Sequence, residues 1–290
     1  MKRIIKWVVY IIKNLCNTLL YLIELLRYNC LFNRLKEKHD GSLVLLANGP
    51  SLKEIIHQLS CNNKFSNVDF IVLNFFAFEP SFFKIKPKHY CFVDPMFFYK
   101  THRYNDVVKL YTILQDKVNW NMNIYIPQTR YSEFVKFCKI NNPYIKIQTV
   151  NNIQYRGFNK FKYFLFKEGL AMPLNATVAN MAIYVGITLG YKKIYLYGVD
   201  HTFFDSLTVN EKNELCNKDT HFYNNSETVL KPIIRNDNGT VWKISEYLES
   251  ITNMFKSHDD LSKYAEYKKI EIFNCTNVSL IDSYKRLIEN

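Results

Sequence analysis

Glycine and proline are scarce in this chain of 290 residues, with eight of each, and no segment repeats. This scarcity excludes collagen-like and low-complexity proteins. Apolar residues make up 48% of the chain and aromatic residues 16%, which is enough for a substantial core and excludes global disorder. The length fits one large domain or two small ones.

The seven cysteines are scattered, and none of them forms a C-x-x-C pair. Such spacing is typical neither of a disulfide framework nor of a zinc site, so we expect a reducing cytosol and no metal. The chain also lacks the P-loop pattern, G-x-G-x-x-G, H-E-x-x-H and G-x-S-x-G. These absences remove the signatures of P-loop and dinucleotide-binding proteins, zinc proteases and serine hydrolases.

The formal net charge is +12, which favours anionic partners. The basic residues are dispersed, and no nucleic-acid-binding motif is present, so we expect nucleotide phosphate or anionic lipid and no nucleic acid.

The first 39 residues form a segment of their own. Over residues 2–27 polar side chains recur at steps of three and four beside a wide apolar face, which predicts a basic amphipathic helix. Lys13 interrupts the apolar run, and no small-residue cleavage site follows, which disfavours a spanning helix and a signal peptide. We expect this helix on an anionic membrane surface. Packing on the domain or on a second subunit is the alternative.

From residue 40 onward, short apolar strands alternate with helical patterns. Strands are expected at 42–47, 69–74, 89–93, 123–126, 193–197 and 270–273, and helices near 131–139 and at 177–189, 241–255 and 259–268. This order predicts a single Rossmann-like α/β domain over 40–290 with a mostly parallel sheet. The Lys/Phe-rich stretch 158–168 is interpreted as a lid or a second basic surface, and 205–240 as a lid-like excursion.

Polar side chains follow four of the expected strands. Asn48 and Ser51, Asn74, Asp94, and Asp200 occupy these strand ends. Because ligands bind beyond the carboxyl ends of parallel strands, we expect a site there. Each residue alone also fits a plain turn or cap.

Glycine, helix starts and histidines complete the candidate site. Gly49 lets the backbone approach a ligand, and Thr177 opens a helix that is either a phosphate cradle or an ordinarily capped helix. His201 and His221 lie where a general base is needed, although a lone histidine is more often structural.

Two segments resemble known proteins. Leu46–Glu54 (LANGPSLKE) is similar to the opening strand and turn of the bacterial family 42 sialyltransferases, and Leu189–Asp200 (LGYKKIYLYGVD) to their later helix–strand unit. Both also resemble the superfamily of the 6-hydroxymethylpterin diphosphokinase-like domain, which includes the motility accessory factors. Residues 200–201 and 218–223 are most like its members from surface-polysaccharide clusters. The resemblance covers 40–287 in patches.

The resemblance implies a metal-independent, inverting glycosyltransferase without a cofactor. It would move a sialic acid-like sugar from a CMP-activated donor to a glycan or glycolipid acceptor, as in lipopolysaccharide or capsule assembly. The expected location is peripheral, on the cytoplasmic side of the inner membrane, with oligomers left open.

The resemblance also implies roles for single residues. Asn48 and Ser51 would contact the nucleotide and its phosphate, and Asn74 and Thr177 would lie near the donor. The sequence departs from the sialyltransferases at Asp94, where they carry Asn, and at Val178, where they carry Ser after Thr. His221 is our choice of base, with His201 second, and Thr202 and Tyr223 are candidates to stabilise the leaving phosphate.

Two other functions remain open at this point. A pterin diphosphokinase would use ATP and Mg²⁺, with Asp94 and Asp200 as carboxylate ligands. A membrane-surface scaffold of polysaccharide assembly would need no cluster of polar strand ends.

Overall fold

The computed structural model describes residues 2–28, 35, 39–53, 55–56, 65, 67–219, 229–235 and 239–287. Its α-helices are α1 (Lys2–Arg27), α3 (Phe82–Ile85), α4 (Tyr104–Lys117), α5 (Tyr131–Cys138), α6 (Asn159–Lys167), α7 (Val178–Leu189) and α8 (Ile244–Lys268). Its strands are β1 (Ser42–Leu46), β2 (Val68–Leu73), β3 (His89–Cys91), β4 (Met122–Pro127), β5 (Ile145–Val150), β6 (Lys193–Tyr197), β7 (Leu207–Val209), β8 (Leu215–Asp219), β9 (Val229–Pro232), β10 (Glu271–Asn274) and β11 (Lys285–Arg286).

Eight strands of the described residues form one parallel sheet in the order β11-β10-β6-β1-β2-β3-β4-β5. The chain runs from β1 to β5 in one direction and from β6 to β11 in the other, so the strand order reverses between β1 and β6. This confirms the predicted Rossmann-like α/β fold. A reversal of this kind opens a crevice beyond the carboxyl ends of the strands.

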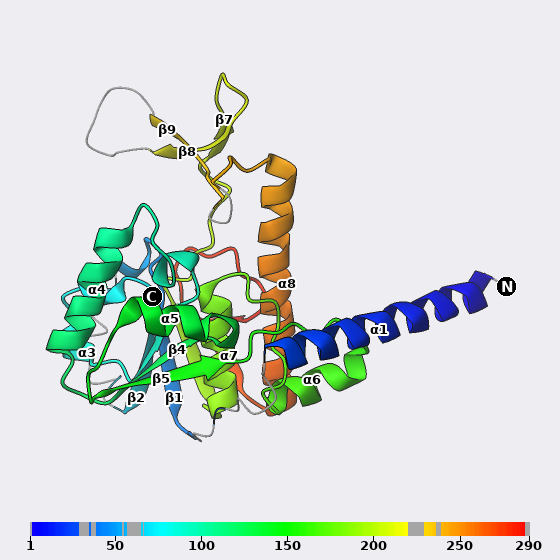
Figure 1. Ribbon diagram of the computed structural model, residues 1–290, viewed down its shortest axis with the longest axis horizontal. Coiled ribbons are helices and arrows are strands. Elements are labelled where there is room, and N and C mark those ends of the chain that lie inside the picture. The colour runs from blue at the N-terminus through cyan, green and yellow to red at the C-terminus, as the bar shows by residue number, and fades with distance from the viewer. Residues whose placement is uncertain are drawn as a thin grey trace.

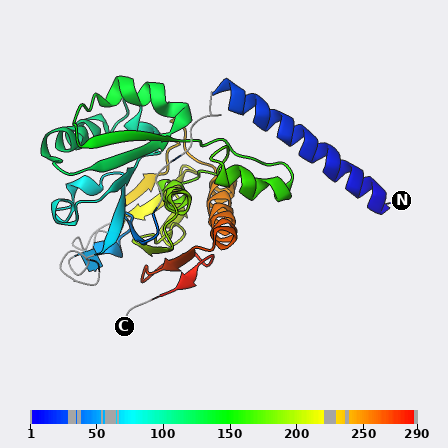
Figure 2. The same ribbon diagram turned by 90° about the horizontal axis from the view of Figure 1, so that it is seen from below.

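Different helices cover the two faces of the sheet. In β1, Leu43 and Leu45 pack in the cluster that contains α7 and α8, whereas Val44 and Leu46 pack in the cluster that contains α4 and α5. Figure 2 shows the sheet between these layers. Because both faces are buried, Leu43 to Leu46 are all apolar, and this is why the strand could be recognised from the sequence.

The prediction of two helices over 241–255 and 259–268 was wrong, because α8 runs unbroken from Ile244 to Lys268. Two of the polar residues between the predicted helices, Ser257 and His258, are buried and bonded inside the domain. Ser257 donates to the Leu174 carbonyl (2.6 Å), and His258 Nδ1 lies 3.0 Å from the Tyr284 hydroxyl.

The excursion at 205–240 contains a small antiparallel sheet, β7-β8-β9, which projects beyond the carboxyl edge of the main sheet (Figure 1). The stretch 158–168 contains α6, which packs against α8 through Phe166 and Tyr264. The helix predicted at residues 2–27 is confirmed as α1, and it extends away from the domain in both views (Figures 1 and 2).

Candidate functional site

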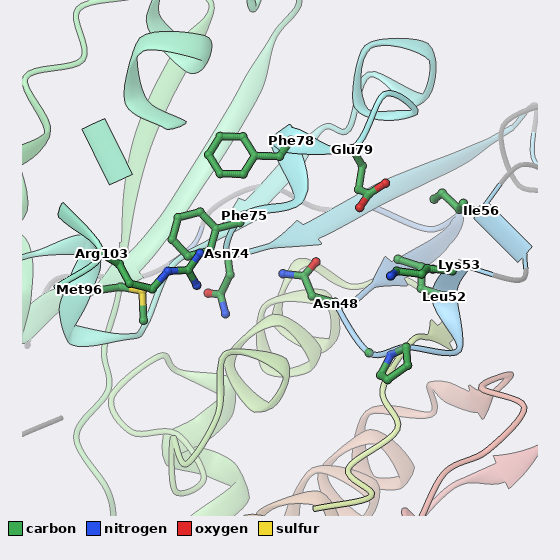
Figure 3. Close-up of a pocket in the computed structure, with 12 residues that line it drawn as sticks. Asn48, Leu52, Lys53, Ile56, Asn74, Phe75, Phe78, Glu79, Met96 and Arg103 are labelled. Atoms are coloured by element: carbon green, nitrogen blue, oxygen red, sulfur yellow. The ribbon is translucent and has the colours of Figure 1, made fainter. Parts of the chain in front are cut away.

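A cavity of about 590 Å³ lies beyond the carboxyl ends of β1, β2 and β3. Its described lining comes from the loop after β1, the loop after β2, the turn after β3 and the start of α4; these residues are Asn48, Gly49, Pro50, Leu52, Lys53, Ile56, Asn74, Phe75, Phe78, Glu79, Met96 and Arg103. Three of the residues predicted from strand ends (Asn48, Gly49 and Asn74) therefore meet at one cavity. Figure 3 shows the amides of Asn48 and Asn74 facing the same space.

The loop after β1 is held in place by Asp200, which follows β6. The buried carboxylate of Asp200 accepts hydrogen bonds from the Ser51 amide (3.1 Å) and from the Ser51 hydroxyl. The Gly49 amide donates to the Gly198 carbonyl (2.9 Å). A Cβ at Gly49 would overlap the Asp200 carboxylate and this carbonyl, so only glycine fits the close approach. Ser51 and Asp200 thus shape the loop and are not part of the cavity lining.

Asn74 and Asp94 form a polar pair behind the cavity. Asn74 has a left-handed backbone (φ 49°), its carbonyl accepts from the Tyr90 hydroxyl (2.5 Å), and its buried Oδ1 has no hydrogen-bond partner among the described residues. Burial raises the pKa of Asp94, and a hydrogen bond from the Asn74 side chain opposes part of that shift. A buried amide oxygen without a partner is rare in native proteins and marks this strand end as a place where a donor group of a ligand would fit.

Aromatic and cationic side chains make up another part of the cavity lining. The Arg103 guanidinium lies 4.1 Å from the centroid of the Phe75 ring. Its Nε and Nη2 each donate a hydrogen bond of 3.0 Å to the Asp106 carboxylate. Phe75 and Phe78 stack at 5.6 Å. Arg103 and Lys53 give the described lining two cations against one carboxylate, that of Glu79. A flat anionic molecule is the kind of ligand that such a wall favours.

Thr177 is the N-cap of α7 and does not line this cavity. Its side chain accepts from the Asn180 amide (3.4 Å), and the Asn180 side chain accepts from the Thr177 amide (3.1 Å). This reciprocal pair is a capping box, so the structure favours the ordinary-cap interpretation over the phosphate cradle.

His201 also lies away from the lining of the cavity. Its Nε2 is 3.1 Å from His258 Nε2, and burial lowers the pKa of His201 to about 4 and the pKa of His258 well below its usual value. Both imidazoles are therefore neutral near pH 7. Thr202 is half-buried beside His201 and lies outside the lining as well. His221 and Tyr223 fall outside the described residues.

A second polar cluster lies at the amino end of the sheet, where His39, Asp69 and His89 approach one another closely enough to suggest a metal site. Both nitrogens of His89 already face tyrosine hydroxyls, Tyr191 at 2.8 Å and Tyr125 at 3.1 Å. The Lys88 ammonium lies 3.1 Å from the Asp69 carboxylate. Because both nitrogens of the His89 imidazole are engaged and the Lys88 ammonium already binds Asp69, this cluster does not fit a metal ion.

Sequence reasoning missed the residues that give the cavity its chemistry, namely Lys53, Phe75, Phe78 and Arg103. They lie in loops and at a helix start, where no spacing rule applies. Lys53 at least stood within the segment that carried the resemblance. A neighbouring cavity of about 520 Å³ shares Met96 with the first and is lined by Thr101, His102 and Arg235 among others. Its histidine was missed as well.

A scan against protein-family models found no family that matches this chain, and a search of curated proteins found no significant match.

Proposed function

We propose that this chain is a glycosyltransferase that takes a sialic acid-like sugar from a CMP-activated donor and works without a metal ion. The observation that supports this most is the cavity at the carboxyl ends of β1 to β3. There, two amides, two cations and an aromatic wall converge in a volume of about 590 Å³. A nucleotide sugar presents a flat base, a phosphate and sugar hydroxyls, which match these three kinds of group.

The cations would take the place that a metal ion has in other transferases. In the proposed reaction an acceptor hydroxyl oxygen attacks the anomeric carbon, and the bond from that carbon to the CMP phosphate oxygen breaks. The electron pair leaves on the phosphate, and a base removes the hydroxyl proton. Lys53 and Arg103 lie on the lining where they would stabilise the leaving phosphate.

The base has three candidates. His221 is the choice from the sequence. His201 would first have to give up its contact with His258 (3.1 Å). His102 is the one histidine in the described lining of the two cavities that share Met96, and it would lie beside an acceptor that binds in the second cavity. Release of CMP from a CMP-sugar by His102→Ala, His201→Ala and His221→Ala would identify which of them carries the reaction.

The first experiment is a thermal-shift panel with CMP, CDP, UDP, GDP and ATP, each in EDTA and in Mg²⁺. A ligand at 100 times its Kd adds about 2.7 kcal/mol to the free energy of unfolding. We expect CMP to stabilise the protein in EDTA and Arg103→Ala to lose most of that shift. Arg130→Ala is the matched control, since Arg130 also contacts an aromatic ring (5.4 Å) but lies outside the cavity.

The other outcomes of the panel decide between the remaining functions. Stabilisation by ATP only with Mg²⁺ would favour the pterin diphosphokinase, with Asp94 as a candidate ligand. If no nucleotide in the panel stabilised the protein, this result would favour the scaffold and contradict our proposal.

A further inference from the structure

Helix α1 turns the side that carries Asn17, Thr18 and Tyr21 toward the domain and leaves most of its apolar residues exposed. Asn17 donates to the Arg156 carbonyl (3.0 Å), the Thr18 hydroxyl lies 3.2 Å from that of Tyr155, and Tyr21 donates to the Leu170 carbonyl (3.0 Å). The exposed apolar residues are Ile4, Ile5, Trp7, Val8, Val9, Ile12, Leu15, Leu19, Leu20, Leu22, Ile23 and Leu26. A face of this extent is rare on soluble monomers and marks a binding surface.

Helix α6 continues this surface. Four of its exposed residues, Lys160, Phe161, Phe164 and Lys167, share one side of the helix. The opposite side is anchored, because Lys162 forms an ion pair with Asp260 (2.5 Å). The side chains of Phe161 and Phe164 are 47% and 53% exposed, although the ring of Phe161 also contacts that of Phe158 (6.4 Å between centroids).

The two helices lie next to each other. The ring of Tyr10 on α1 lies 6.3 Å from that of Phe158, the N-cap of α6. Both views place α6 beside α1 at the same side of the domain (Figures 1 and 2). The absence of a side chain at Gly157 allows α1 to come this close, because a Cβ there would overlap the Thr18 and Tyr155 hydroxyls.

We propose that α1 and α6 together form one surface that binds a bilayer of anionic lipids, with Phe161 and Phe164 inserted beside the apolar face of α1. Helix α1 carries five basic side chains and one acidic one, and α6 adds Lys160 and Lys167. Basic residues beside exposed aliphatic and aromatic ones are the signature of helices that lie in the headgroup region. This inference does not depend on the ligand of the cavity.

Charge and geometry favour this occupant over the others. A second copy of α1 would bring like charges together along the contact. By length and composition α1 is apolar enough to cross a membrane. In a crossing, however, the stretch from Asn14 to Leu25 would have to leave its contacts with the domain, because a span needs about 20 residues in the bilayer.

The test is flotation of the full-length protein with vesicles of phosphatidylcholine alone and of phosphatidylcholine mixed with phosphatidylglycerol. We expect the wild-type protein to bind the mixed vesicles. For Phe161→Ser/Phe164→Ser we expect the partition coefficient to fall by about tenfold. The matched control is Tyr131→Ser/Val135→Ser, which removes two exposed apolar side chains from α5. Lys160→Glu/Lys167→Glu should weaken binding to mixed vesicles, whereas Lys84→Glu/Lys109→Glu should not.

Trp7 reports the depth of insertion, since it is 64% exposed on α1. Its emission should shift to shorter wavelength with mixed vesicles, and lipids brominated near the headgroup should quench it more than lipids brominated near the chain end; Trp7→Phe identifies the signal. Wild-type partitioning of the α6 double variant would overturn the inference. So would strongest quenching from the chain end together with resistance to carbonate extraction, which indicates a span. A stable dimer that does not float would assign the surface to a second copy.

Discussion

At the scale of the residue, Gly49 joins the loops after β1 and β6, because its amide donates to the Gly198 carbonyl (2.9 Å). Its neighbours Asn48 and Lys53 line the cavity, so the position of this loop decides where their side chains point. The loop is fixed from behind by the two hydrogen bonds of Ser51 to Asp200. The Asp200 carboxylate would thus affect a ligand of the cavity only through the backbone that it holds.

Gly49→Ala should therefore disturb both stability and binding. The added Cβ overlaps the Asp200 carboxylate and the Gly198 carbonyl, and relief of such an overlap costs about 1–3 kcal/mol. We expect a lower Tm and a smaller CMP-induced shift in the thermal panel. Gly41→Ala is the control at the other end of β1, because nothing lies within 4 Å of its Cβ. Equal behaviour of the two variants would contradict this account of the loop.

The buried histidines should make the free energy of unfolding depend on pH. Burial lowers the pKa of His89 to about 3 and that of His201 to about 4, and it lowers the pKa of His258 strongly. In the unfolded chain these groups titrate near 6.5, so below this pH the unfolded state binds more protons. The free energy of unfolding is thus highest above pH 6.5 and falls toward pH 4, by up to about 1.4 kcal/mol per pH unit for each histidine.

Urea unfolding at pH 7.5, 6.0 and 5.0 measures this dependence. His201→Gln/His258→Gln removes two of the groups and should flatten the curve between pH 6.5 and 5. A double variant with the wild-type slope would mean that these imidazoles are not the ones that take up protons.

At the scale of the element, the N-terminus of α7 tests whether Thr177 is a cap or a ligand contact. Thr177→Ala removes one half of the capping box, which should cost about 1 kcal/mol of stability and leave the CMP-induced shift unchanged. Thr112→Ala is the control, because that hydroxyl bonds only within α4, to the Val108 carbonyl (3.0 Å). Loss of the CMP shift without loss of stability would instead support the phosphate cradle.

Elements with a strong apolar pattern were the ones that the sequence could predict. β1 and β6 are mostly apolar, α7 has ten buried residues, and α1 has a wide apolar face. β5 lies at the edge of the sheet with only Val150 buried, and its sequence IKIQTV carries little signal. The unbroken course of α8 depends on partners of Ser257 and His258 that are distant in sequence, which local patterns do not contain.

The site was predictable to the same extent. Asn48 and Asn74 could be found because parallel strands bring their carboxyl ends to one edge. Arg103 and Phe75 could not, because their meeting depends on how two loops fold back over that edge. Asp200 was predicted from its position after β6, but its carboxylate binds Ser51 and does not line the cavity.

At the scale of the whole molecule, α1 divides into two parts with different surroundings. Residues 2–9 are all exposed, whereas Tyr21 and Leu25 belong to the hydrophobic core. The outer part therefore contributes nothing to the packing of the domain. It does carry three of the basic side chains and Trp7, which the proposed bilayer surface needs.

Deletion of residues 2–9 should consequently separate folding from membrane binding. We expect the Tm and the CMP-induced shift of the shortened protein to equal those of the full chain, while flotation with anionic vesicles falls several-fold. Deletion of residues 2–28 should also lower the Tm, because it uncovers Tyr155 and the Leu170 carbonyl, which Tyr21 contacts. If the shorter deletion lowered the Tm as much as the longer one, the outer part of α1 would have to pack on the domain or on a second copy. This outcome would contradict the proposal that the exposed face of α1 binds a bilayer.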